Sequence, residues 1–232
     1  MSSKSDDSES KHGDNYTSLL EGVVRKILEP LEGVPLKHVV KLVTGHSVLE
    51  FDPLAENNAK LLKQLEEAAK KAGQQANAEG LWSARPNEVG NRIEKHVKRA
   101  LASEGLIVFD PQTKRGKSKA GYPDIGVEDA QGRTVYLECK TYEPGKENQS
   151  FRTFYWKVSK DTKVTKDAFH LVLTYSRERT QELNEQRENR YRFLTWGIYN
   201  VEDLPLNLKP EFFASNKAMY TGGALLAHGT CE

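Results

Sequence analysis

Cysteine is scarce in this sequence: only Cys139 and Cys231 occur, and they lack the close spacing of a zinc site. A disulfide framework is therefore not expected, and a reducing cytoplasm is the default compartment. Long apolar runs are also missing, so no segment reaches the length of a membrane span. Residues 1–15 are polar and acidic without the apolar centre of a secretory signal, which indicates a disordered tail.

An excess of one charge is absent as well, because the net charge is +1. The distribution of charge decides nucleic-acid binding more than the net value does. Basic residues gather in two clusters, one of Lys114, Arg115, Lys117 and Lys119 and one of Lys157, Lys160, Lys163 and Lys166. Each cluster is compatible with a DNA-binding face and equally with an ordinary solvated loop.

The pattern of apolar residues predicts helices first and strands afterwards. A helical period recurs in residues 16–31, 53–72 and 86–104. Pro30 and Pro35 break the first helix, while Gly73 and Gly105 are expected to end the other two. Strands are expected at 106–109, 124–128, 133–141, 169–175 and 193–199, and the charged stretch 177–192 as a helix or an exposed loop. This order predicts an α/β (α+β) fold with a central mixed β-sheet flanked by helices.

The strands at 124–128 and 133–141 are expected to form a hairpin that carries chemically active side chains. Alternation places Glu138 and Lys140 on the same face of the second strand. A three-residue loop, residues 130–132 with Gly132 in the left-handed conformation, fixes the register. Counting back equally along both strands then sets Asp124 opposite Glu138, with Cβ atoms about 5 Å apart. A longer loop would shift the register and spoil this alignment.

Asp124 and Glu138 at that spacing repel each other unless a cation lies between them. Carboxylate oxygens with open coordination positions suit Mg²⁺ or Mn²⁺ rather than zinc. Lys140 would lie beside the metal, where an ammonium group can orient water and offset charge on a scissile phosphate. These groups together describe phosphodiester hydrolysis. The alternative is that both acids are ordinary surface residues and Lys140 is their ion-pair partner.

Pro123-Asp124 followed by Glu138-Cys139-Lys140 resembles the motif of the PD-(D/E)xK nuclease superfamily, which includes most type II restriction endonucleases. The resemblance implies a restriction-endonuclease-like core that contains a metal site. Asp124, Glu138 and the backbone carbonyl of Cys139 would bind the metal. Lys140 would act on the nucleophilic water.

The same resemblance implies a further catalytic and metal-binding acidic residue, on the helix before the hairpin. Glu94 is the better candidate, whereas Glu88 lies near a helix N-terminus, where the helix dipole alone favours an acid. The resemblance covers roughly residues 86–175. The predicted division of the chain is a tail of residues 1–15, a helical region of residues 16–80 for dimerisation or DNA clamping, and a nuclease core of residues 81–232.

DNA contacts are expected from the basic clusters and from the aromatic and basic segment 150–157. The candidates are Lys114, Arg115, Lys117, Lys119, Arg152, Tyr155, Lys157 and Lys160. The basic residues between 114 and 119 are expected to contact phosphates rather than bases. Phe151 and Phe154 in the same aromatic segment are expected to pack in the core instead.

These features predict a Mg²⁺-dependent endodeoxyribonuclease acting on double-stranded DNA, of the type II restriction class, in which Mn²⁺ can substitute for Mg²⁺. A homodimer in a prokaryotic cytoplasm is expected, because two-fold symmetry is the simplest way to cut both strands of a symmetric site. Two alternatives stay open. One is a structure-specific repair or recombination nuclease, and the other is a non-catalytic DNA-binding module with the same fold.

Overall fold

The computed structural model describes residues 18–27, 29, 31–116, 121–146, 154, 156 and 161–209. Its contacts divide the chain into two compact units. The first consists of Met1–Gly33 together with Leu206–Glu232, and the second is Val34–Pro205. In the first unit, residues 18–27 are helical, which confirms that part of the helix predicted at 16–31. Its two segments are joined where the amide of Leu208 donates to the carbonyl of Leu31 over 2.8 Å.

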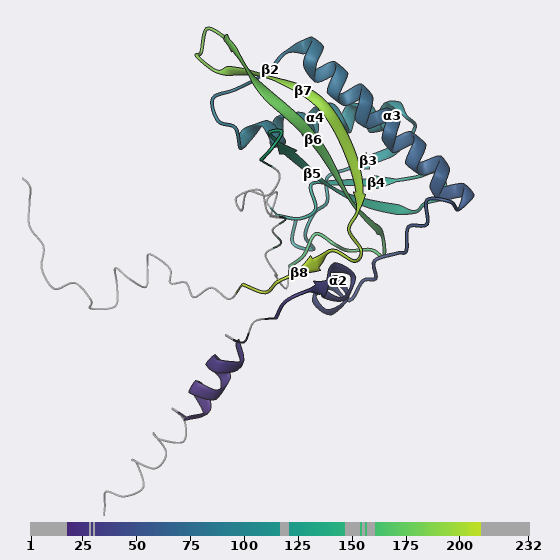
Figure 1. The fold of residues 1–232 in the computed structure, drawn as a ribbon. Helices are drawn as coiled ribbons and strands as arrows, with labels where there is room; N and C mark the ends of the chain where they lie inside the picture. Colours follow the sequence, from purple (N-terminus) through teal and green to yellow (C-terminus); the bar gives the residue numbers. More distant parts are fainter. Residues whose placement is uncertain are drawn as a thin grey trace, which may run out of the picture. The chain divides into compact units, whose positions relative to one another are not determined.

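The second unit is built on a six-stranded mixed sheet in the order β2-β7-β6-β5-β4-β3 (Figure 1). The strands are β2 (Leu81–Ser83), β3 (Ile107–Phe109), β4 (Ile125–Glu128), β5 (Thr134–Tyr142), β6 (Phe169–Leu183) and β7 (Asn189–Asn200). The central pair β5–β6 is parallel and the other pairs are antiparallel. This arrangement confirms the predicted mixed sheet.

Two helices, α3 (Glu56–Glu79) and α4 (Glu88–Ser103), pack together on one face of this sheet (Figure 1). The hydrophobic core lies between them and the sheet, and includes Leu65, Ile93, Leu137 and Leu171. The helix predicted at 86–104 is therefore confirmed, and its apolar stripe is the buried face. The apolar area removed from water here is the main stabilising contribution to the fold.

Helix α3 corrects one prediction, because it continues past Gly73 to Glu79. Gly73 does not end the helix; it lies within it, buried against the sheet. A Cβ atom at this position would lie 3.4 Å from the ring of Tyr175. The glycine thus lets the helix approach the sheet closely. In the sequence alone, a glycine with this packing role cannot be told from one that ends a helix.

The charged stretch 177–192 also differs from its prediction as a helix or loop. It forms the distal arms of the β6–β7 hairpin, which turns at Asn184–Glu188. Opposite charges face each other across the two strands, and Arg192 and Glu178 are 2.8 Å apart. Cross-strand ion pairs of this kind let a highly charged segment persist as a strand.

Four short elements were not predicted, and one of them is strand β2 at the edge of the six-stranded sheet. Helix α2 (Leu36–Thr44) starts directly after Pro35, which precedes a helix here rather than only breaking one. Strands β1 (Val34–Pro35) and β8 (Pro205–Leu206) pair as a separate two-stranded sheet. Among the described residues, none of the helices combines the length and apolar character needed to cross a membrane.

Candidate active site

The β4–β5 hairpin has the predicted register. Gly132 adopts a φ of 75°, and the amide of Asp129 donates to the carbonyl of Arg133 over 3.1 Å. Ile125 is then paired with Leu137. The amide of Asp124 donates to the carbonyl of Leu137 over 3.2 Å, so Asp124 lies beside Glu138 as expected. The three-residue loop is therefore confirmed as the feature that aligns the two acids.

Strand β5 continues to Tyr142, whereas β4 starts only at Ile125. Beyond the end of β4, the amide of Cys139 donates to Oδ2 of Asp124 over 2.9 Å. A side chain thus takes the place of a partner strand at this edge of β5. The Cys139 side chain itself is buried in the core, as its position in the strand predicts.

Glu138 is only 6% exposed, yet its two oxygens differ in their surroundings. Oε1 accepts a hydrogen bond from Nζ of Lys140 over 2.8 Å. Oε2 is buried, and no donor to it is found among the described residues. Burial raises the pKa of Glu138 to about 7, and the neighbouring charge of Asp124 adds to the increase.

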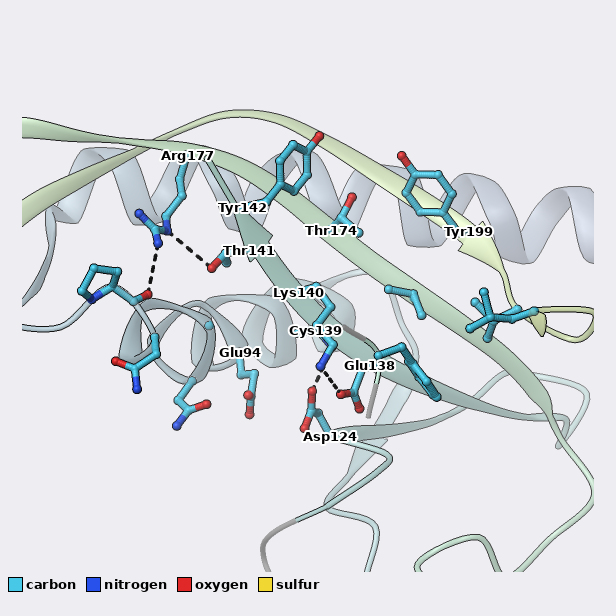
Figure 2. Close-up of a pocket in the computed structure, with 18 of the residues that line it drawn as sticks. Glu94, Asp124, Glu138, Cys139, Lys140, Thr141, Tyr142, Thr174, Arg177 and Tyr199 are labelled. Atoms are coloured by element: carbon cyan, nitrogen blue, oxygen red, sulfur yellow. Dashed lines mark hydrogen bonds and ion pairs between the residues drawn. The ribbon is translucent and has the colours of Figure 1, made fainter. Parts of the chain in front are cut away.

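Helix α4 forms the opposite wall of the site. Its residues Gly90, Asn91 and Glu94, with Asn87 just before the helix, line a cleft of about 800 Å³ together with Asp124, Glu138, Lys140 and residues of β6 and β7. Figure 2 shows the Glu94 carboxylate on the helix side, near the two acids of the hairpin. Burial raises the pKa of Glu94 to about 7, with a further contribution from Asp124.

Glu88, the second candidate on this helix, is not among the described residues that line the cleft. Its carboxylate accepts a hydrogen bond from Oγ of Ser83 over 3.3 Å and lies 3.8 Å from Arg92. The structure therefore brings Glu94 to the hairpin acids and holds Glu88 at the start of the helix.

The turn before Asp124 is supported by residues to which the sequence assigned no role in the site. Nζ of Lys163 donates to the carbonyls of Gly121 and Pro123 over 2.6 and 3.2 Å. The hydroxyl of Tyr122 lies 2.5 Å from Nδ1 of His170, and both side chains are buried. Burial lowers the pKa of His170 to about 4, so this ring is neutral at pH 7.

Lys163 had been grouped with the basic cluster 157–166 as part of a candidate DNA-binding face. The structure corrects this, since Lys163 is 5% exposed and points into the protein. No local pattern distinguishes it from its neighbours in the sequence. Its position depends on the path that the chain takes past the hairpin.

The start of helix α4 is held by Arg177, whose side chain is fully buried. Its guanidinium donates to the carbonyl of Pro86 over 3.2 Å and to a carboxylate oxygen of Glu143 over 3.2 Å. It also lies over the ring of Tyr191, 4.6 Å from the centroid. A single residue of β6 thus links the helix that carries Glu94 to the far end of the hairpin strand.

The predicted DNA contacts are only partly within the described residues. Lys114 and Arg115 are exposed in the loop after β3. Lys117, Lys119, Arg152, Tyr155, Lys157 and Lys160 lie outside the described residues, as does Phe151. Phe154, predicted to pack in the core, is instead partly buried and lines the cleft, where its ring packs edge-on against Tyr122 with ring centroids 5.1 Å apart.

The donor set at the hairpin consists of oxygen atoms and suits a hard cation. In the part of the chain that the structure describes, no group of three or more His, Cys, Asp and Glu residues forms a metal centre. Mg²⁺ usually keeps several waters and takes one or two carboxylates together with substrate phosphates. Asp124 and Glu138 could supply such a two-carboxylate site, since Oε2 of Glu138 accepts no hydrogen bond from the described residues.

A mixed sheet whose hairpin presents two carboxylates and a lysine to a cleft defines the class of restriction-endonuclease-like enzymes. Residues 31–223 match the family described as the type II restriction enzyme MjaV family. Over 222 residues the chain is 34% identical to the type II restriction enzyme MjaV of Methanocaldococcus jannaschii, covering 89% of this chain and 93% of that protein. The chain belongs to the type II restriction enzyme MjaV family.

Proposed function

We propose that the protein is a Mg²⁺-dependent endodeoxyribonuclease that hydrolyses phosphodiester bonds at a specific sequence in double-stranded DNA. The observation that carries the proposal is the cluster of Asp124, Glu138 and Lys140 in one cleft, with Nζ of Lys140 2.8 Å from Glu138. Membership of a type II restriction enzyme family supports the same activity.

Asp124 and Glu138 are proposed to bind the metal. One oxygen of Asp124 is occupied by the Cys139 amide, which fixes the orientation of the carboxylate. The buried Oε2 of Glu138 has a desolvated negative charge that a cation would stabilise. When bound, Mg²⁺ supplies positive charge next to a phosphate and eases the deprotonation of a nearby water. The carbonyl of Cys139 is the third proposed ligand.

Lys140 is proposed to contact the attacking water or the scissile phosphate. Its side chain is 35% exposed, so the ammonium group can reach the cleft while its contact with Glu138 limits its movement. An ammonium at this position favours the charge that develops on phosphate oxygens. Glu94 is proposed as the third acid of the site, on the opposite wall of the cleft.

The remaining parts of the proposal concern partners. We propose a cytoplasmic homodimer on duplex DNA, with Lys114, Lys117, Lys119 and Arg115 on phosphates and Arg152, Tyr155, Lys157 and Lys160 as further contacts. Residues 16–80 are proposed to serve dimerisation or DNA clamping. Mn²⁺ is proposed to substitute for Mg²⁺.

The test is incubation of the purified full-length protein with unmethylated plasmid and phage DNA, in Mg²⁺ and in EDTA. Discrete fragments that require Mg²⁺ are expected, and sequencing of their ends would give the cleavage site. Asp124→Asn should abolish the fragments, and Glu88→Gln should leave them unchanged. Cleavage only of branched or single-stranded substrates, or no cleavage in any divalent metal, would contradict the proposal.

A further inference from the structure

Lys163 is a buried cation that the proposed reaction does not use directly. It is 5% exposed and its Nζ donates to the carbonyls of Gly121 and Pro123. The charges of Asp124, Glu138 and Glu94 all act on it. The same ammonium group is therefore bonded to the turn, and its charge interacts with those of the three acids of the cleft.

Burying an ammonium group costs free energy unless it is paired or hydrogen-bonded. Lys166, three residues further on, shows the ordinary alternative, since its side chain is 55% exposed and 3.2 Å from Glu128. Packing alone would be served better by an apolar residue at position 163. The contacts that Lys163 makes thus point to a specific use of its charge and its donors.

The turn that Lys163 holds leads directly into Asp124. The Asp124 backbone is joined to β5 through Leu137, and its carboxylate is joined to the Cys139 amide. Lys163 adds a bond to the carbonyl of the preceding residue, Pro123. These contacts restrain Asp124 on both sides. Without Lys163 the turn would lose its bonds to the carbonyls of Gly121 and Pro123 and would keep the restraint toward β5 and the contact of Tyr122 with His170.

Lys140 and Lys163 lie in different environments. The side chain of Lys140 is 35% exposed in the cleft, whereas Lys163 is buried and bonded to main-chain carbonyls. Of these two lysines, Lys140 is the one placed to reach a substrate. Lys163 is placed to act on the reaction through the residues that it holds.

We propose that Lys163 is a positioning residue, which holds the Gly121–Pro123 turn so that Asp124 presents its carboxylate to a divalent cation beside Glu138. The proposal rests on the metal-binding roles proposed above for Asp124 and Glu138. Loss of Lys163 is expected to weaken metal binding and slow cleavage, while binding of DNA without metal stays the same.

The experiment measures Mn²⁺ binding to the full-length protein by calorimetry without DNA, using MnCl₂ as the probe. The variants are Lys163→Met, Lys163→Gln and Lys163→Arg, with Lys166→Met as the matched control. Thermal melting establishes that each variant folds. DNA binding in EDTA and the Mn²⁺ concentration that gives half-maximal cleavage are measured on the same preparations.

We expect Lys163→Met and Lys163→Gln to bind Mn²⁺ at least tenfold more weakly, with a parallel shift in the Mn²⁺ requirement for cleavage. Lys163→Arg, which keeps the charge and several donors in a different shape, should lose three- to tenfold. DNA binding in EDTA should change less than twofold. Lys166→Met should match the wild type in Mn²⁺ binding and in the Mn²⁺ requirement for cleavage.

Folded Lys163→Met or Lys163→Gln with wild-type Mn²⁺ binding would overturn the inference. If neither variant folds, Lys163→Arg decides, and wild-type Mn²⁺ binding by that variant would overturn it. A wild-type protein that binds no Mn²⁺ and cuts no DNA would instead remove the proposed function, and this inference with it. The wild-type measurement therefore separates the two failures.

Discussion

The two walls of the cleft hold their acids in different ways. On the sheet side, Glu138 is 6% exposed and Asp124 accepts a hydrogen bond from a main-chain amide. On the helix side, Glu94 is only partly buried, and no hydrogen bond to it is found among the described residues. The sheet wall is thus restrained by backbone bonds, whereas Glu94 is placed by the position of its helix.

This difference suggests a division between the walls. The sheet side sets the geometry in which a cation and a phosphate are held, and it tolerates little change. The helix side contributes charge from a group that can adjust its position. The predictions below test that division, from the largest expected effect to the smallest.

Asp124→Asn or Glu138→Gln should reduce the cleavage rate by about a thousandfold or more, because each removes a charge on which metal binding depends. Fragment formation under single-turnover conditions would measure this. DNA binding in EDTA should persist, which separates loss of chemistry from loss of substrate. A residual rate within tenfold of the wild type would show that the acids of the sheet wall are not required for cleavage.

The stability of the metal-free protein should depend on pH through Glu138. Its pKa is raised to about 7, so the folded state binds this proton more tightly than the unfolded state does. The stabilisation that protonated Glu138 gives the folded state is fully present below about pH 4.5 and is lost as the pH rises through 7. The free energy of unfolding falls by at most about 3 kcal/mol over this range.

Chemical unfolding between pH 5 and pH 8 would measure this loss. Glu138→Gln should flatten the pH dependence more than Glu94→Gln does, since Glu94 is less buried and water screens its charge. Added Mg²⁺ should restore stability at pH 8 and have little effect at pH 5. An unchanged pH dependence in Glu138→Gln would show that another group is responsible.

Lys140→Met should slow cleavage by about a hundredfold, because the ammonium acts on water or phosphate rather than as a metal ligand. The expected signature is a lower maximal rate with little change in Mn²⁺ affinity. Calorimetry with Mn²⁺ and single-turnover rates would separate these quantities. A tenfold loss of Mn²⁺ affinity without a change in maximal rate would assign Lys140 to the binding of metal instead.

Glu94→Gln should have the smallest effect, about tenfold on the rate, since its wall is less restrained and contributes charge from a distance. Glu88→Gln on the same helix is the matched control and should cleave like the wild type. If Glu94→Gln were as inactive as Asp124→Asn, the two walls would be equivalent and the comparison would fail.

The hairpin was predictable because its geometry depends on local features. Alternation along 133–141 and the left-handed conformation of Gly132 set the register, and these are readable from neighbouring residues. The mixed sheet and the helix 88–103 were predictable for the same reason, since their periodic patterns are long and regular.

Other features depended on contacts between distant segments. Gly73 lies within α3 because the ring of Tyr175 is next to it, and no local pattern predicts that neighbour. The arms of the β6–β7 hairpin look like a loop in the sequence because they are highly charged. In the structure these charges are paired across the two strands, which the sequence of either strand alone does not reveal. The inward position of Lys163 requires the fold itself. Local chemistry in the sequence thus revealed the acids but not their supports.

The parallel pairing of β5 and β6 has a consequence for how cutting can depend on recognition. Parallel neighbours require the chain to return along the sheet, so residues 143–168 form one connection. Its described residues Phe154 and Trp156 pack on Tyr122. Lys163, in the same connection, donates to the carbonyls of Gly121 and Pro123, the two neighbours of Tyr122 in the sequence. Arg152, Lys157 and Lys160, proposed to contact DNA, belong to the same connection. A substrate that displaced this connection would therefore act mechanically on the Asp124 turn, which would make the rate of cutting sensitive to how well the bound sequence fits.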